Sequence, residues 1–209
     1  MDTSNEEIME TLEAIKQRRS VKHYDTQYDL SDEEINKILN NAVLSPTSFN
    51  IQNWRFLIVK DKEIRQQIRE AAWDQAQITE ASTLIVVCAD TKAWEKKPER
   101  YWRNAPKEVQ DKMVPLIRQF YQDRDQIQRD EAIRSCGIAA QTIMLTAKEL
   151  GYDSCPMIGF DPNAVAEIIN LPQDHLIGLL IVVGKAVQPA RPRGGQLDLN
   201  EVVIWDKFN

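Results

Sequence analysis

Residues 131–150, EAIRSCGIAAQTIMLTAKEL, carry apolar side chains around most of the circumference of a helix. This pattern is typical of a helix that is buried rather than one that lies on a surface. Its small residues Gly137, Ala139 and Ala140 would allow neighbouring elements to approach closely. Gly151 follows directly, at the position where a glycine commonly ends a helix. The sequence therefore predicts a central buried helix around which the other elements pack.

The regions on either side of this helix alternate between helical and strand patterns. Amphipathic spacing predicts further helices at residues 5–19, 31–44, 61–72 and 162–169. Runs of β-branched residues predict strands at 55–60, 83–89 and 176–186. Ser31 with Glu34 three positions later forms a capping-box pattern at the start of the second helix. Because no linker, repeat or low-complexity segment interrupts the chain, we expect residues 1–209 to form one α+β domain.

The segment 91–128 is rich in aromatic and basic residues and contains three prolines. We interpret it as an irregular turn followed by an exposed helix, and as a cover segment over a site. Its aromatic residues either pack on the sheet or line the mouth of that site. They are Trp94, Tyr101, Trp102, Phe120 and Tyr121, interspersed with Arg100, Arg103, Arg118 and Arg124.

Composition excludes several classes of protein. The 209 residues include 26 basic and 32 acidic side chains, a net charge of −6, which argues against general binding to nucleic acid or to anionic membranes. The three cysteines show no CxxC pairing, as expected in a reducing compartment. The acidic N-terminus lacks the apolar run of a signal peptide, and no stretch approaches a membrane span of about 20 residues. We therefore expect a cytoplasmic protein that binds neither nucleic acid nor membrane.

Common catalytic motifs are absent from the sequence. There is no GxGxxG and no GxxxxGK[ST], so neither a dinucleotide-binding fingerprint nor a P-loop is supported. His23 and His175 lie far apart without ligand spacing, which predicts no metal site. Cys155 and His175 alone do not make a nucleophile pair, because buried structural cysteines are far commoner. If the protein is an enzyme, the chemistry belongs to something other than its side chains.

Four short segments are candidates for ligand binding, and each also has a simpler explanation. Basic residues at 18–22 complement a helix dipole or bind a phosphate. Polar residues at 45–54 make a turn or meet a heterocycle. Residues 156–160 form a tight turn or let backbone N–H groups approach a planar ligand. The basic loop 190–195 is solvated surface or a phosphate clamp.

Taken in order, these segments resemble the FMN-binding nitroreductase family over residues 10–205. The matching stretches are RRSVKHYD (18–25), SPTSFNIQNWRF (45–56), WDQAQITEAS (73–82), GIAAQTIMLTAKELGYDSCPMIGFDP (137–162) and GKAVQPARPR (184–193). Asn53 departs from the pattern, because many relatives have proline before the tryptophan. Ile158 is a second departure, at a position where relatives often have glutamate or glycine.

The resemblance implies a mixed sheet flanked by helices on both faces, in an intertwined homodimer with two FMN sites. The tail 187–209 is expected to reach the partner subunit. The flavin phosphate and the pyrimidine side of the ring are assigned to Arg18, Arg19, Ser20, Lys22, Arg191 and Arg193. Contacts from the other subunit are assigned to Thr47, Ser48 and Asn50, and Pro46 is assigned to cofactor binding. Polar contacts to the ring or ribityl chain are assigned to Asp74, Gln75 and Gln77. Residues along the isoalloxazine are Pro156, Met157, Ile158 and Gly159, with the Ile158 N–H directed at N5.

The activity that the resemblance implies is transfer of electrons from NADH or NADPH through FMN to a nitroaromatic or quinone, in a ping-pong cycle. Flavin supplies such redox chemistry while the protein supplies orientation and electrostatics, so no catalytic side chain is expected. Two alternatives stay open at this point. One is a related flavoenzyme with another substrate, such as an enone reductase, a dehalogenase or a flavin-consuming enzyme. The other is an FMN-binding protein without turnover.

Overall fold

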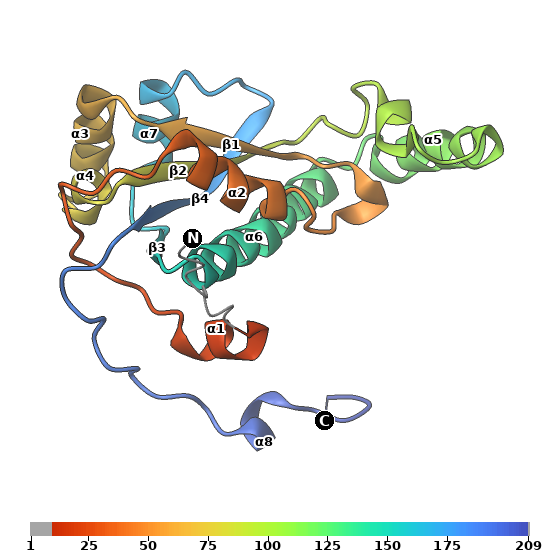
Figure 1. Ribbon diagram of the computed structural model, residues 1–209. Coiled ribbons are helices and arrows are strands. Elements are labelled where there is room, and N and C mark those ends of the chain that lie inside the picture. The colour runs from red at the N-terminus through yellow and green to blue at the C-terminus, as the bar shows by residue number, and fades with distance from the viewer. Residues whose placement is uncertain (1–9, 209) are drawn as a thin grey trace, which may run out of the picture.

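The protein folds around a four-stranded sheet in the computed structural model, which describes residues 10–208 (Figure 1). The strands are β1 (Trp54–Val59), β2 (Thr83–Asp90), β3 (Asp153–Met157) and β4 (His175–Gly184). Their order is β1-β2-β4-β3, and all three pairings are antiparallel. Parallel pairing is present at the isolated bridge between Ser20 and Ser154, where the chain after the first helix lies along β3.

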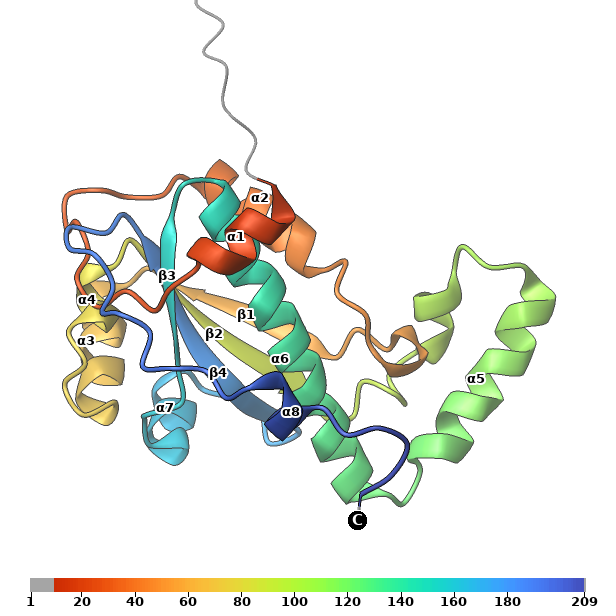
Figure 2. The ribbon, with the colours of Figure 1, turned by 90° about the horizontal axis from the view of Figure 1, so that it is seen from below.

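Helices cover both faces of the sheet, as the α+β prediction required. Along β2, Leu84 and Val86 contact one layer of the core, while Ile85 and Val87 contact the other. This alternation follows from the two-residue period of a strand. The first layer includes α3 (Lys62–Ala71), α4 (Gln77–Glu80) and α7 (Pro162–Ile168). The second includes α2 (Asp32–Ala42) and α6 (Asp125–Glu149), with α1 (Thr11–Gln17) packed on α6 (Figure 2).

Local signals set the ends of several helices. Ser31 caps α2, and its side chain and that of Glu34 complete the predicted capping box. Asp61 and Asp161 accept two backbone N–H bonds each at the starts of α3 and α7. Gly151 has a φ of +76°, the left-handed conformation that glycine adopts after a helix end. Of the predicted helix 5–19, residues 5–9 lie outside the described part of the chain.

The central helix differs from its prediction in two ways. It begins at Asp125 rather than Glu131. The added turn includes Gln128, a buried polar residue that accepts a hydrogen bond from Lys92 and donates one to the Tyr121 carbonyl. The helix is also buried on one face alone. A Cβ atom on Gly137 would meet no atom of residues 10–208 within 4 Å, so the described residues do not approach this glycine as closely as predicted.

The segment 91–128 extends away from the sheet as η2 (Pro98–Trp102) and α5 (Lys107–Tyr121), the predicted turn and exposed helix (Figures 1 and 2). It has a small core of its own, in which Trp94, Tyr101 and Tyr121 are buried with Ile51 and Ile117. Most of its aromatic residues therefore stabilise the segment. Phe120 is an exception, since 38% of its surface is exposed.

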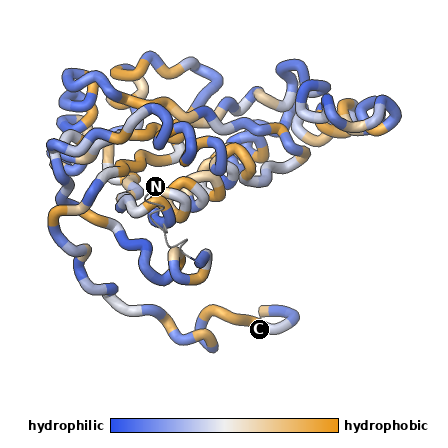
Figure 3. The backbone as a smooth tube through the Cα atoms, in the orientation of Figure 1, coloured by the Kyte–Doolittle hydropathy of each residue, from blue (hydrophilic) through white to orange (hydrophobic). Residues whose placement is uncertain are grey.

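The C-terminal segment leaves β4 and runs along the outside of the molecule to a short helix, α8 (Leu199–Val202). It is rich in hydrophobic residues that touch little of their own chain (Figure 3). Trp205 and Phe208 are 84% and 82% exposed. Large apolar side chains held in this way are typical of an interaction surface. Within the described residues, no helix combines the length and the apolar character needed to cross a membrane.

Candidate active site

Three segments predicted to bind one ligand meet at the free edge of β3. Pairing of Ser20 with Ser154 places the basic segment 18–22 along this strand, and the Val21 N–H donates to the Ser154 carbonyl at 3.1 Å. The Arg193 guanidinium donates to the carbonyl oxygens of Lys16 and Arg18, at 3.0 and 3.1 Å. Arg19 donates in turn to the carbonyl of Arg191. The segment after the first helix and the C-terminal tail thus form one cationic cluster, which consists of Arg18, Arg19, Arg191 and Arg193.

The cluster has more positive charge than the chain neutralises. Within residues 10–208, no carboxylate forms an ion pair with Arg18, Arg19, Arg191 or Arg193. Burial, followed by repulsion from Arg193, lowers the pKa of Arg18. The Arg18 Nη1 atom is also buried without a hydrogen-bond partner in the described chain. A buried, unsatisfied guanidinium nitrogen among other cations is suited to an anion such as a phosphate.

A row of amide side chains leads from this edge to the loop after β3. Gln77 Nε2 donates to the Met157 sulfur at 3.2 Å and to Gln75 Oε1 at 3.0 Å. Gln75 Nε2 then donates to the Gly159 carbonyl at 2.7 Å. A Cβ atom on Gly159 would lie 2.9 Å from Cζ3 of Trp73, so only glycine allows this close packing without displacement of the ring. Residues predicted from two distant motifs are therefore in direct contact.

The loop that presents these amides has an unusual backbone. Trp73 and Asp74 have positive φ values of 53° and 56°. Such values are uncommon in residues other than glycine and concentrate at functional sites. The Asp74 carboxylate pairs with Arg69 at 2.6 Å, which neutralises the one acidic residue assigned to the site. Beside it, the Ile158 side chain is 80% exposed and leaves the loop surface open to a ligand.

The fourth predicted segment, residues 46–50, lies elsewhere. It follows α2 toward α5, away from β3 (Figures 1 and 2). The Ser48 N–H donates to Glu131 at 3.0 Å, and the Asn50 amide donates to the Tyr101 carbonyl at 2.7 Å. Asn50 also has a φ of +56°. Within a single subunit, the segment 46–50 is therefore not part of the cationic cluster.

Cys155 is a buried residue of β3, next to Ser154, which pairs with Ser20. Burial raises the pKa of its thiol, although the ammonium of Lys22 and the hydroxyl of Ser20 oppose that rise. Strand pairing sets Cys155 opposite Val182, whereas His175 stands at the other end of β4. A cysteine–histidine nucleophile pair is therefore absent from this arrangement.

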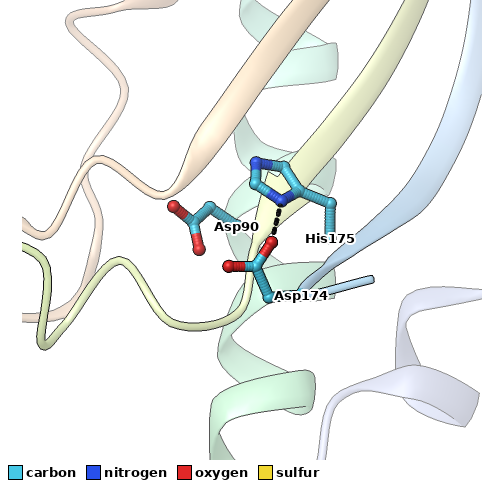
Figure 4. Close-up of side chains that lie close together, drawn as sticks. All are labelled: Asp90, Asp174 and His175. Atoms are coloured by element: carbon cyan, nitrogen blue, oxygen red, sulfur yellow. Dashed lines mark hydrogen bonds and ion pairs between the residues drawn. The ribbon is translucent and has the colours of Figure 1, made fainter. Parts of the chain in front are cut away.

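A second polar cluster at the opposite end of the sheet was not predicted. Asp90 ends β2 and pairs in register with His175, which begins β4 beside Asp174 (Figure 4). His175 Nδ1 lies 2.7 Å from an Asp174 oxygen. The Lys96 ammonium lies 2.8 Å from Asp90 and 2.5 Å from Asp174, so a lysine already supplies the positive charge that a metal would. Through the ion pairs of Lys96, this cluster connects the start of the segment 91–128 to the sheet.

Chemically, the edge of β3 combines a cationic cluster, a row of neutral amides and a loop that contains Gly159. It lacks a positioned nucleophile or an acid–base pair among its described side chains. Such a surface can hold and orient a planar, phosphate-bearing cofactor. Comparison with known proteins agrees with this chemistry. The family model described as "Nitroreductase family" matches residues 15–185.

The chain belongs to the nitroreductase family.

Individual nitroreductase relatives cover most of the chain. The chain is similar to protein DrgA of Synechocystis sp., with 55% identity over 182 residues and 87% of each protein covered. It is 33% identical to the oxygen-insensitive NADPH nitroreductase of Helicobacter pylori strain 26695, covering 91% of this chain and 94% of that protein. Among solved structures, an Exiguobacterium sibiricum protein assigned as a nitroreductase, in complex with FMN, matches with a TM-score of 0.88. It is 32% identical and the match covers 94% of this chain and 97% of that one.

Proposed function

We propose that this nitroreductase-family chain is an FMN-dependent NAD(P)H oxidoreductase that reduces nitroaromatics, quinones or both by a ping-pong mechanism. The observation that carries the proposal is the cationic cluster at the edge of β3, with its unsatisfied Arg18 Nη1 and no carboxylate partner in the described chain. The FMN complex of the Exiguobacterium relative and the activity named for the Helicobacter relative support it.

The charge and the hydrogen-bonding groups at this edge support FMN as the ligand. Arg18, Arg19, Arg191 and Arg193 would hold the phosphate, with Ser20 and Lys22 toward the pyrimidine side of the ring. Guanidinium groups suit that task because they give directional, charge-assisted hydrogen bonds. The loop 156–159 would lie along the ring, with the Ile158 N–H toward N5. The amides of Gln75 and Gln77 would face the ring or the ribityl chain.

FMN bound at this edge would supply the redox chemistry between the nicotinamide donor and the acceptor. The side chains orient the cofactor and stabilise negative charge at one edge of its ring, as expected for cations in a partly buried site. Donor and acceptor would use the same open face in turn. The lack of an acid–base pair at the edge of β3 is consistent with this division of roles.

The complete site would contain residues of two subunits. The segment 46–50 runs from α2 toward α5, away from β3 and the cationic cluster of its own chain, as a contribution across an interface requires (Figures 1 and 2). The exposed face of α6 around Gly137 and the apolar C-terminal segment offer the surfaces for such a homodimer. The tail 187–208 would then extend over the partner subunit.

The deciding experiment is the visible spectrum of the purified protein before and after anaerobic addition of NADH or NADPH. We expect flavin absorption that bleaches with either donor and returns when a quinone or a nitroaromatic is added. A colourless protein that does not take up added FMN would refute the assignment. A yellow protein that no donor bleaches would instead indicate a flavin-binding protein without turnover.

A further inference from the structure

A second concave site lies at the base of the segment 91–128. It is a pocket of about 690 Å³ between η2, the turn that follows it and the start of β1. We name it the basic pocket and define it by Arg55, Arg100, Arg103, Trp102, Asn104 and Gln52, which line it. Its volume falls within the range of about 300 to 1,000 Å³ that is usual for sites of small ligands.

The charge of the basic pocket has one sign. Three of its lining residues are arginines and none is acidic, although the protein as a whole carries a net charge of −6. Arg103 forms no ion pair within the described residues. Arg55 has one carboxylate neighbour, Asp90, at 3.4 Å. Such a concentration of guanidinium groups on an acidic protein favours an anionic ligand.

Contacts between the two sides fix the shape of the basic pocket. The Asn50 amide donates to the Tyr101 carbonyl at 2.7 Å, and Trp102 Nε1 donates to the Phe49 carbonyl at 3.1 Å. The backbone of Asn50 and Gln52 is held at positive φ, +56° and +42°. Residues in these sparsely populated conformations persist where surrounding contacts fix them, and they concentrate at ligand sites.

The basic pocket adjoins the segment that we assign to the partner's flavin site, because Asn50 belongs to both. A ligand that reacts at the flavin and extends beyond it would therefore reach this pocket. Of the substrates in the proposed function, only the electron donor is long enough and carries phosphates. We propose that the basic pocket binds the phosphorylated adenosine end of NADPH, so that the enzyme prefers NADPH over NADH.

The chemistry of recognition follows from the lining. Arginine commonly accommodates the 2′-phosphate that distinguishes NADPH from NADH. Arg103 supplies a guanidinium without an ion pair among the described residues, and Arg100 supplies a second whose Nη2 donates to the Tyr101 hydroxyl at 2.7 Å. The Trp102 ring offers a face on which adenine can stack. The amides of Gln52 and Asn104 provide neutral donors and acceptors for the ribose or the base. Because the 2′-phosphate is absent from NADH, these contacts would discriminate between the two donors.

This inference rests on the proposed function, so its test separates the two. The flavin-loaded protein is titrated calorimetrically with 2′,5′-ADP and with 5′-AMP, which differ by the 2′-phosphate. We expect 2′,5′-ADP to bind more tightly, and Arg103→Ala to weaken that binding roughly ten- to a hundredfold, as for loss of a charge-assisted contact. In steady-state assays, Arg103→Ala should lower kcat/KM for NADPH by a similar factor and leave that for NADH nearly unchanged.

Arg129→Ala serves as the matched control, because Arg129 is exposed on α6 and does not line the pocket. Equal binding of the two nucleotides would overturn the proposal, as would equal effects of Arg103→Ala and Arg129→Ala. An unchanged preference in the double variant Arg100→Ala/Arg103→Ala would overturn it as well. In all these cases, flavin bleaching by either donor would show that the proposed function still stands.

Discussion

The side-chain amide of Gln75 donates a 2.7 Å hydrogen bond to the carbonyl of Gly159, across 84 residues of sequence. The same Gln75 accepts a bond from Gln77, which also contacts the Met157 sulfur. The bond therefore fixes the loop after β3 against the loop before α4. Both loops carry residues that we assign to the flavin ring.

We expect Gln75→Leu to weaken flavin retention and to lower the melting temperature slightly. Loss of this one hydrogen bond should reduce stability by about 1 kcal/mol, and hence Tm by about 2 to 4 °C for a chain of this size. Flavin retained after dialysis and differential scanning calorimetry measure the two effects. Gln66→Leu is the control, because the Gln66 amide bonds only to Glu70 on the exposed side of α3. Equal flavin retention in both variants would show that Gln75 does not contribute to cofactor binding.

The charge cluster makes a second prediction. Arg193→Ala should reduce FMN affinity about ten- to a hundredfold, since a charge-assisted phosphate contact is worth roughly 1.5 to 3 kcal/mol. The variant should remain folded, because the Arg193 side chain is exposed and donates only to two carbonyls of the first helix and its end. Fluorescence titration of the apoprotein with FMN gives the affinity. Retention of flavin equal to the unmodified protein would count against the phosphate assignment.

Short-range signals in the sequence were enough to predict parts of the fold, whereas the assignment of the site residues stays a prediction. The capping pair Ser31 and Glu34 predicted the start of α2 correctly. Strand β3 was missed, because Pro156 and the polar residues of DSCPM resemble a turn, and a proline is tolerated only because β3 lies at the edge of the sheet.

Contacts between residues distant in the sequence could not be predicted from local sequence patterns. The bond between Gln75 and Gly159 depends on positive φ at Trp73 and Asp74, and no glycine marks those positions. The Asp90–His175 pair depends on the register between β2 and β4, which tertiary packing sets. Gly137 was predicted at a close packing contact, yet its surroundings are open within the chain because it faces away from the sheet. Sequence periodicity does not distinguish a face that packs on the same chain from one that packs on another.

Gly137 therefore gives a third prediction, about assembly. A Cβ at this position would have no atom of residues 10–208 within 4 Å, and the substitution removes a glycine, which disfavours helices, so Gly137→Leu should not destabilise the fold itself. If α6 packs against a second α6, the leucine should disrupt the dimer. Size-exclusion chromatography with light scattering at micromolar concentration should show twice the chain mass for the unmodified protein and a shift toward monomer for the variant. A flavin-loaded monomer of the unmodified protein would refute the dimer.

Two adjacent aromatic residues of α5 should behave differently. Tyr121 is fully buried against Trp94 and Ile117, so Tyr121→Ala should destabilise the protein by about 3 to 5 kcal/mol. Phe120 is partly exposed and packs on Phe49, with ring centroids 5.3 Å apart. Phe120→Ala should change kcat/KM unequally between a quinone and a nitrophenol, with little change in melting temperature or FMN content. A uniform effect on all acceptors would exclude Phe120 from substrate selection.

The polar cluster in Figure 4 makes stability depend on pH in a defined window. The hydrogen bond from Lys96, with a further one from His175, lowers the pKa of Asp174 from 3.8 to about 2. A carboxyl whose pKa is lower in the folded state stabilises the fold above its unfolded pKa. That contribution should be complete above about pH 4 and lost as the pH falls through about 2.

Lys96→Met tests this linkage. The variant should be less stable at pH 7, because it leaves Asp90, which is 3% exposed at its side chain, without the ammonium. The difference in free energy of unfolding from the unmodified protein should stay constant down to about pH 4 and then shrink. Below pH 4 the unfolded chain binds a proton at Asp174, whereas the folded protein, in which Lys96 stabilises the carboxylate, does so only near pH 2. Urea unfolding at pH 7, 4 and 2.5 measures this difference. Lys107→Met removes an exposed pair with Asp111 and should have little effect at any pH. A difference between Lys96→Met and the unmodified protein that persisted unchanged at pH 2.5 would show that Lys96 acts through Asp90 or through packing of its aliphatic stem, and that attraction to Asp174 does not stabilise the start of the segment 91–128.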